Sequence, residues 1–93
     1  MAKPASPPAP PPASRAVWRD LDTALLRSFV TLANTGSFTR TAEMVGRTQP
    51  AVTLQIRRLE ALLGQPLFAR SHRNVAVTTA GELLLPYARQ VLE

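Results

Sequence analysis

The sequence predicts a mainly α-helical fold of four helices and one short β-hairpin. Apolar residues recur at three- and four-residue spacing in four segments between residues 20 and 93, as they do in helices that bury one face. Three of these segments are followed by Gly36, Gly46 and Gly64, and glycine favours the left-handed conformation after a last helical turn. Two short apolar runs, PLFA and VAVT, lie on either side of polar residues 71–74 and predict the hairpin.

Composition suits one small domain. The chain has 93 residues, 45% of them hydrophobic, a formal net charge of +5 and no cysteine. Because it lacks cysteine and has His72 as its single histidine, we expect no disulfide framework and no soft-metal site, and a reducing intracellular compartment is compatible with this composition. We expect a cytoplasmic protein without a cofactor. No apolar run approaches the roughly 20 residues of a membrane span. Residues 1–19 are rich in proline and alanine, which predicts a disordered tail.

The first two helices have recognisable start signals. Asp20 or Asp22 can cap the first helix, and Ser37 or Thr39 can cap the second, which runs to Val45. The predicted apolar stripe of the first helix consists of Leu21, Leu25, Leu26, Phe29, Val30 and Ala33.

Thr48 caps the third predicted helix, although a proline follows almost at once. Pro50 takes the second helical position, where it costs no hydrogen bond because first-turn amides have no partner inside the helix. The helix ends before Gly64 and Pro66. Its predicted core face consists of Val52, Ile56, Leu59 and Leu63.

The second and third helices have the spacing of a helix-turn-helix, in which two helices meet at a tight turn with a glycine. Ala42 is small enough for the helices to approach, Gly46 gives the turn its freedom, and Val52 fills the space between them. The second helix of such a pair inserts its amino-terminal end into the major groove of DNA. The sequence therefore predicts DNA binding through residues 49–63.

The outward surface of that third helix carries side chains that suit bases. Gln49 can bridge N6 and N7 of adenine, and Pro50 and Leu54 can contact thymine methyl groups. Thr53 can bind a base or a phosphate, and Arg57 can reach a phosphate or a guanine.

Charge supports this prediction without deciding it. Between residues 47 and 73 lie five arginines and one acid, Glu60, and Lys3 is the only lysine. Arginine suits phosphate and base recognition because its planar fork donates two parallel hydrogen bonds. A basic face that only keeps the domain soluble is an equal alternative on charge alone. Arg58 points away from Gln49, and we expect it to be solvated.

The fourth helix begins at Thr78 or Thr79, and Thr79 with Glu82 fits a capping box. It has one apolar stripe of Gly81, Leu84, Ala88 and Val91 and a second of Leu85 and Leu92. One stripe is enough to dock on the domain, so the second predicts a partner helix and hence a homodimer. Pro86 lies inside this helix and predicts a slight bend.

Residues 33–70, ANTGSFTRTAEMVGRTQPAVTLQIRRLEALLGQPLFAR, followed by VTTAG at 77–81, resemble the amino-terminal winged helix-turn-helix of LysR-type bacterial transcriptional regulators. The resemblance covers about residues 20–93, with its motifs in order and at the family's spacing. It implies a winged helix-turn-helix of three helices and a two-stranded wing at 20–77, and a truncated linker helix that forms the dimer at 78–93. It also implies that the family's effector-binding domain, and with it a small-molecule effector, is missing from this fragment.

The resemblance implies which residues contact a pseudo-palindromic operator. Arg73, supported by Arg70, is expected to enter the minor groove from the wing at 67–77. Leu54 stands where many relatives have arginine, so a guanine contact is lost or replaced by methyl packing. Arg47 stands where a small apolar residue is common and adds a phosphate contact. The full expected set is Arg40, Arg47, Thr48, Gln49, Pro50, Thr53, Leu54, Arg57, Arg70 and Arg73.

Two other classes of protein are less well supported. An enzyme would need paired carboxylates, a nucleophile beside a base, or a glycine loop for phosphate, whereas the glycines here are scattered and His72 stands alone in a predicted turn. We therefore expect no catalysis. A winged helix that binds only proteins is favoured by a mixed or acidic outer face on the third helix, and the face here is Gln-Pro-Thr-Arg.

Overall fold

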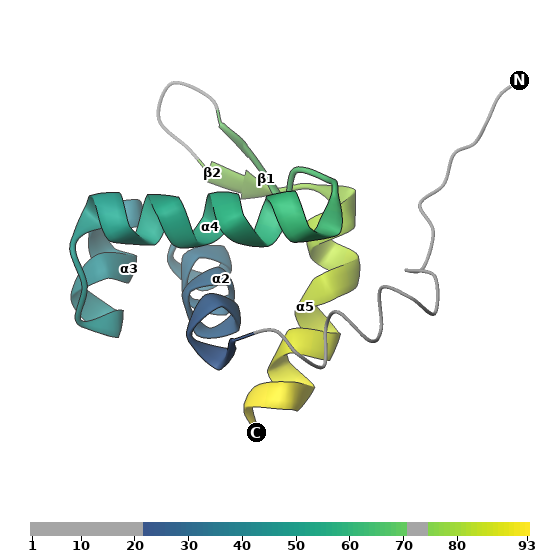
Figure 1. Ribbon diagram of the computed structural model, residues 1–93, viewed down its shortest axis with the longest axis horizontal. Coiled ribbons are helices and arrows are strands. Elements are labelled where there is room, and N and C mark those ends of the chain that lie inside the picture. The colour runs from purple at the N-terminus through teal and green to yellow at the C-terminus, as the bar shows by residue number, and fades with distance from the viewer. Residues whose placement is uncertain (1–21, 71–74) are drawn as a thin grey trace, which may run out of the picture.

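The computed structural model describes residues 22–70 and 75–93, which form helices around a core and a two-stranded antiparallel sheet (Figure 1). The elements are α2 Thr23–Thr35, α3 Phe38–Val45, α4 Gln49–Leu63, β1 Phe68–Arg70, β2 Val75–Val77 and α5 Thr79–Leu92. This arrangement confirms the predicted winged helix-turn-helix. The predicted tail at 1–19 and the tip of the wing, with His72 and Arg73, lie outside the described residues. No described helix is long and apolar enough to span a membrane.

The start of each of the first three helices is fixed by its cap. A side-chain oxygen of the cap accepts a hydrogen bond from a first-turn amide, which would otherwise have no partner. The pairs are Asp22 with Ala24 at 2.9 Å, Ser37 with Arg40 at 3.1 Å and Thr48 with Ala51 at 3.2 Å. Asp22, Ser37 and Thr48 were all among the predicted caps.

Helix α2 is the centre of the fold, because it packs against α3, α4 and α5 (Figure 1). Leu26, Phe29 and Leu32 are fully buried on it. The predicted stripe omitted Leu32 and included Leu25 and Val30, which are only half-buried. With helices around it, α2 buries a face wider than one stripe, so spacing alone could not identify every core residue.

The predicted capping box of α5 is wrong. Thr78 caps the helix, since its hydroxyl accepts from the amide of Gly81 at 3.1 Å and donates to the carbonyl of Pro66 at 2.8 Å. Counted from Thr78, the position that would carry the returning carboxylate is Gly81, which has no side chain. Glu82 therefore stands one residue too late to complete the box.

The two predicted stripes of α5 also need correction. Gly81, Leu84 and Ala88 are buried as predicted, whereas Val91 is 40% exposed. Leu92 packs against the core in its place, and Leu85 packs there too. Residues three and four positions after Ala88 lie almost equally close to the same face, so the pattern could not choose between them. The exposed large apolar side chains of α5 are Leu83 and Val91.

The two strands pair in register Phe68 with Val77, Ala69 with Ala76 and Arg70 with Val75. Glu60 of α4 ties this wing to the helix, because its carboxylate accepts hydrogen bonds from the amides of Leu67 at 2.8 Å and Phe68 at 3.4 Å. The Phe68 ring packs edge-on against Phe29 with centroids 5.5 Å apart. The wing is therefore fixed both to α4 and to the core.

Candidate nucleic-acid interface

The turn between α3 and α4 determines how α4 stands on the domain. Gly46 has φ 73°, in the left-handed region, and the amide of Arg47 donates to the carbonyl of Ala42 at 2.9 Å. Ala42 and Val52 are buried in the same core cluster, which the spacing predicted for the junction of the two helices. The predicted helix-turn-helix is confirmed.

The start of α4 is the exposed end of this unit. Residues 47–50 are all exposed, and Leu54 is 54% exposed although it is large and apolar. Thr53, predicted to face outward, is half-buried. The sequence has no acidic residue between Met44 and Leu59. The tip of α4 therefore offers an amide, apolar side chains and the positive end of a helix, without a nearby carboxylate on the same segment to repel phosphate.

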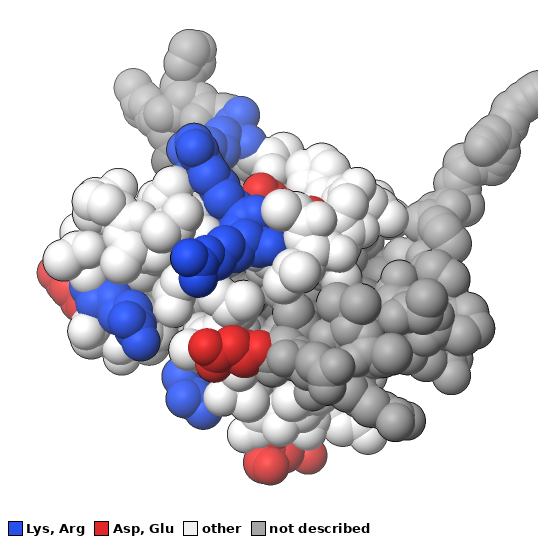
Figure 2. All heavy atoms as spheres, viewed as in Figure 1, with Lys and Arg blue, Asp and Glu red and all other residues white. Residues whose placement is uncertain are grey.

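The predicted arginines come from several elements. Those within the described residues are exposed: Arg40 on α3, Arg47 in the turn, Arg57 on α4 and Arg70 on β1. None of them forms an ion pair with a carboxylate in that part of the chain. Figure 2 shows basic atoms gathered over α4 and again beside the wing. Arg58 is exposed, as expected, and Arg73 lies outside the described residues.

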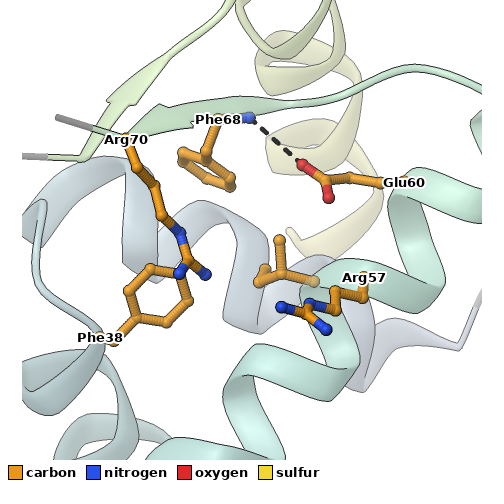
Figure 3. Close-up of a pocket in the computed structure, with 6 residues that line it drawn as sticks. Phe38, Arg57, Glu60, Phe68 and Arg70 are labelled. Carbon is orange, nitrogen blue, oxygen red and sulfur yellow. Dashed lines mark hydrogen bonds between the residues drawn. The ribbon is translucent and has the colours of Figure 1, made fainter.

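A hollow of about 290 Å³ lies where α3, α4 and β1 meet (Figure 3). It is lined by Phe38, Ile56, Arg57, Glu60, Phe68 and Arg70. The guanidinium carbon of Arg70 lies 4.6 Å from the centre of the Phe38 ring, which is a cation–π contact. The structure thus brings two of the predicted arginines, Arg57 and Arg70, to one hollow, while Arg40 and Arg47 stand apart from it.

Sequence reasoning missed two residues of this region. Phe38 appeared only within the segment at residues 33–70 that carries the family resemblance, without a role of its own. Glu60 was counted as the one acid in a basic segment, whereas its carboxylate is occupied by two wing amides. Phe38 contacts a strand far along the chain, and Glu60 reaches across the turn that follows α4, so both roles depend on the folded arrangement and no local pattern predicts them.

A family model described as "Bacterial regulatory helix-turn-helix protein, lysR family" matches residues 23–82. The HTH-type transcriptional regulator AbaB of Streptomyces antibioticus is 58% identical over 64 residues, which are 69% of this chain and 21% of AbaB. This chain spans between 21% and 26% of the length of the first curated relatives that it matches.

Solved structures show the same fold. The crystal structure of the CbnR_DBD–DNA complex has a TM-score of 0.74 and 36% identity, and the match covers 77% of this chain and 83% of that chain. The crystal structure of BenM_DBD with catB site 1 DNA has a TM-score of 0.73 and 35% identity, and the match covers 77% of each chain. Both of those proteins were crystallised with DNA.

Proposed function

This chain belongs to the lysR family of bacterial regulatory helix-turn-helix proteins, and we propose that it binds double-stranded DNA sequence-specifically as part of a transcription regulator. The observation that carries this proposal is the exposed, acid-free tip of α4 at residues 47–50, continued by Leu54. In a helix-turn-helix this end of the second helix enters the major groove. A bacterial regulator of this kind acts in the cytoplasm, where the chromosome lies.

The exposed side chains of α4 suit base edges. Gln49 has the amide that can pair with adenine, and Pro50 and Leu54 supply apolar surface for thymine methyl groups. The proposed DNA-contacting residues are those expected from the sequence: Arg40, Arg47, Thr48, Gln49, Pro50, Thr53, Leu54, Arg57, Arg70 and Arg73. Among the described residues of this set Thr53 is the least accessible, because its side chain is half-buried. We expect only the exposed part of that side chain, its methyl group or its hydroxyl, to contact DNA.

The proposal includes a homodimer through α5. Leu83 is 46% exposed and Val91 is 40% exposed on that helix, so its apolar surface is larger than the domain covers. A twofold pair of chains would place two copies of α4 at half-sites about one DNA turn, or a multiple of it, apart.

A selection from random duplexes at low salt tests the function. We expect the chain to enrich one pseudo-palindromic sequence, whose affinity exceeds that of an unselected duplex about 10³-fold or more. A charge-matched control replaces Gln49, Pro50 and Leu54 by alanine and should retain weak binding without enriching any sequence. Recovery of no DNA by the unchanged chain at about 50 mM salt would overturn the proposal and would favour the protein-binding winged helix instead.

A further inference from the structure

Arg57 and Arg70 come from different elements and their guanidinium groups both point into the hollow between α3, α4 and β1 (Figure 3). Arg57 projects from the middle of α4, and Arg70 is the last residue of β1. Arg57 and Arg70 are 13 positions apart in the sequence, so the fold, and not the local chain, brings them together.

The hollow has a net positive charge, because two arginines and one acid line it among the described residues. The carboxylate of that acid, Glu60, accepts hydrogen bonds from the amides of Leu67 and Phe68 and forms no ion pair with either arginine. Neither arginine has an acidic partner among residues 22–70 and 75–93. Two guanidinium groups directed at one space repel each other, and an anion placed between them removes that repulsion.

Phe38 fixes the direction of one of the two arginines. The Arg70 guanidinium lies over its ring, which holds the side chain back against α3 instead of leaving it free beside the wing. Phe38 and Phe68 both line the same hollow.

The position of the hollow indicates the kind of anion. It lies between α4, proposed for the major groove, and the strands of the wing, proposed for the neighbouring minor groove. In a duplex, one sugar–phosphate backbone separates a major groove from the minor groove beside it. A backbone phosphate is therefore the group that a hollow between α4 and the wing would meet.

We propose that Arg57 and Arg70 together bind a single phosphate of the DNA backbone, and that Phe38 is the positioning residue for Arg70. This inference rests on the proposed function. It differs from independent phosphate contacts in a measurable way, because counterion release counts the phosphates that are neutralised and not the arginines that do it.

The experiment places one uncharged methylphosphonate at a time along the selected duplex and measures affinity for the unchanged chain, R57Q, R70Q and R57Q/R70Q. For the unchanged chain we expect one position between the two grooves at which neutralisation lowers affinity about tenfold. That loss should shrink in each single variant and vanish in the double variant at the same position. Thermal unfolding of each variant checks that the domain still folds.

Salt dependence gives a second readout with a matched control. The slope of log affinity against log salt should fall in magnitude by about 0.9 in R57Q/R70Q, and by about 1.8 in R40Q/R47Q, which removes the same charge from two separate phosphates. Phe38→Leu should reduce the loss at the shared phosphate, and Phe38→Tyr should keep it.

Two results would overturn the inference while leaving DNA binding intact. One is that R57Q and R70Q lose sensitivity at two different phosphates. The other is a slope change near 1.8 for R57Q/R70Q. Absence of DNA binding by the unchanged chain would instead remove the proposed function itself.

Discussion

The hydroxyl of Ser28 on α2 donates a hydrogen bond to Oε1 of Gln55 on α4, at 2.5 Å. Ser28 is only 1% exposed, so its hydroxyl depends on this partner. The bond joins the central helix to the helix proposed for the major groove. Because Gln55 directly follows the exposed Leu54, the bond also helps to fix which face α4 turns outward.

We predict that Ser28→Ala lowers the free energy of unfolding by about 1 to 2 kcal/mol, because it leaves a half-buried amide oxygen without a partner. Chemical denaturation measures the change. Thr39→Ala, which removes an exposed hydroxyl on α3, is the control and should change stability by less than about 0.5 kcal/mol. Equal stability of the Ser28 variant and the unchanged chain would show that the Gln55 amide finds another partner.

Where the sequence predicted the structure well, the determining interaction is local. Thr48 caps α4 through an amide three residues away, and Gly46 ends α3 through its own left-handed backbone conformation. Neighbouring residues are therefore sufficient to predict where these helices begin and end. The tip of α4 at residues 49 and 50 was placed correctly for the same reason. The hairpin was also predicted from a local pattern, two short apolar runs around a polar turn, and the family resemblance then identified it as the wing.

Where prediction failed, the determining partner is remote in sequence. Thr78 is preferred over Thr79 as the cap of α5 because its hydroxyl also donates to the carbonyl of Pro66. Pro66 precedes the two strands of the wing in the sequence, and Thr78 follows them. Leu92 packs against the core in place of Val91, on a helix that contacts α2, which lies far away in the sequence. The stacking of Arg70 on Phe38 needs the finished fold as well.

A second prediction concerns the change in stability when Gly81 is replaced by alanine. Helix propensity alone would predict that this change stabilises the domain, and we expect the opposite. Alanine normally favours a helix over glycine by about 1 kcal/mol. A Cβ at Gly81, however, would lie 2.4 Å from a methyl carbon of Val77 and 2.5 Å from the carbonyl oxygen of Leu67. We therefore predict that Gly81→Ala destabilises the domain by about 1 to 3 kcal/mol in thermal or chemical unfolding. Glu82→Ala, at the exposed neighbour, should be nearly neutral, and a stabilised Gly81 variant would contradict this close approach.

Gln49 is predicted to discriminate between sequences. Gln49→Ala should lower affinity for the selected site by about 1 to 3 kcal/mol and leave binding to unrelated DNA almost unchanged, because only the base contact is lost. Fluorescence anisotropy with both duplexes measures the difference. Gln65→Ala removes an exposed glutamine beyond the other end of α4 and should affect neither duplex. Equal losses on both duplexes would assign Gln49 to the backbone instead.

DNA binding is predicted to weaken steeply with salt. If about four arginines of one protomer neutralise phosphates singly, the slope of log affinity against log salt is near −3 to −4, and a shared phosphate at Arg57 and Arg70 brings it toward −3. Titrations at several salt concentrations between about 50 and 200 mM measure this slope. An affinity that does not change over this range is incompatible with phosphate contacts by the arginines.

The last prediction concerns self-association through α5. Leu83 and Val91 lie exposed on this helix, and an apolar surface of this kind is stabilised when a second copy covers it. Pro86 lies inside this helix, where it removes one backbone hydrogen bond, so we expect the helix to bend slightly. Sedimentation over a concentration series should therefore show a monomer–dimer equilibrium that palindromic DNA tightens.

Leu83→Lys should raise the dimer dissociation constant about tenfold or more, because pairing would then bury a charge. Met44→Lys makes the same change at a side chain of α3 that is 68% exposed, and it should leave the equilibrium unchanged. Since two linked copies of α4 bind two half-sites together, loss of the dimer should also remove the advantage of a palindrome over a single half-site. A chain that stays monomeric at all concentrations, and binds one half-site as tightly as two, would exclude α5 as the dimer helix.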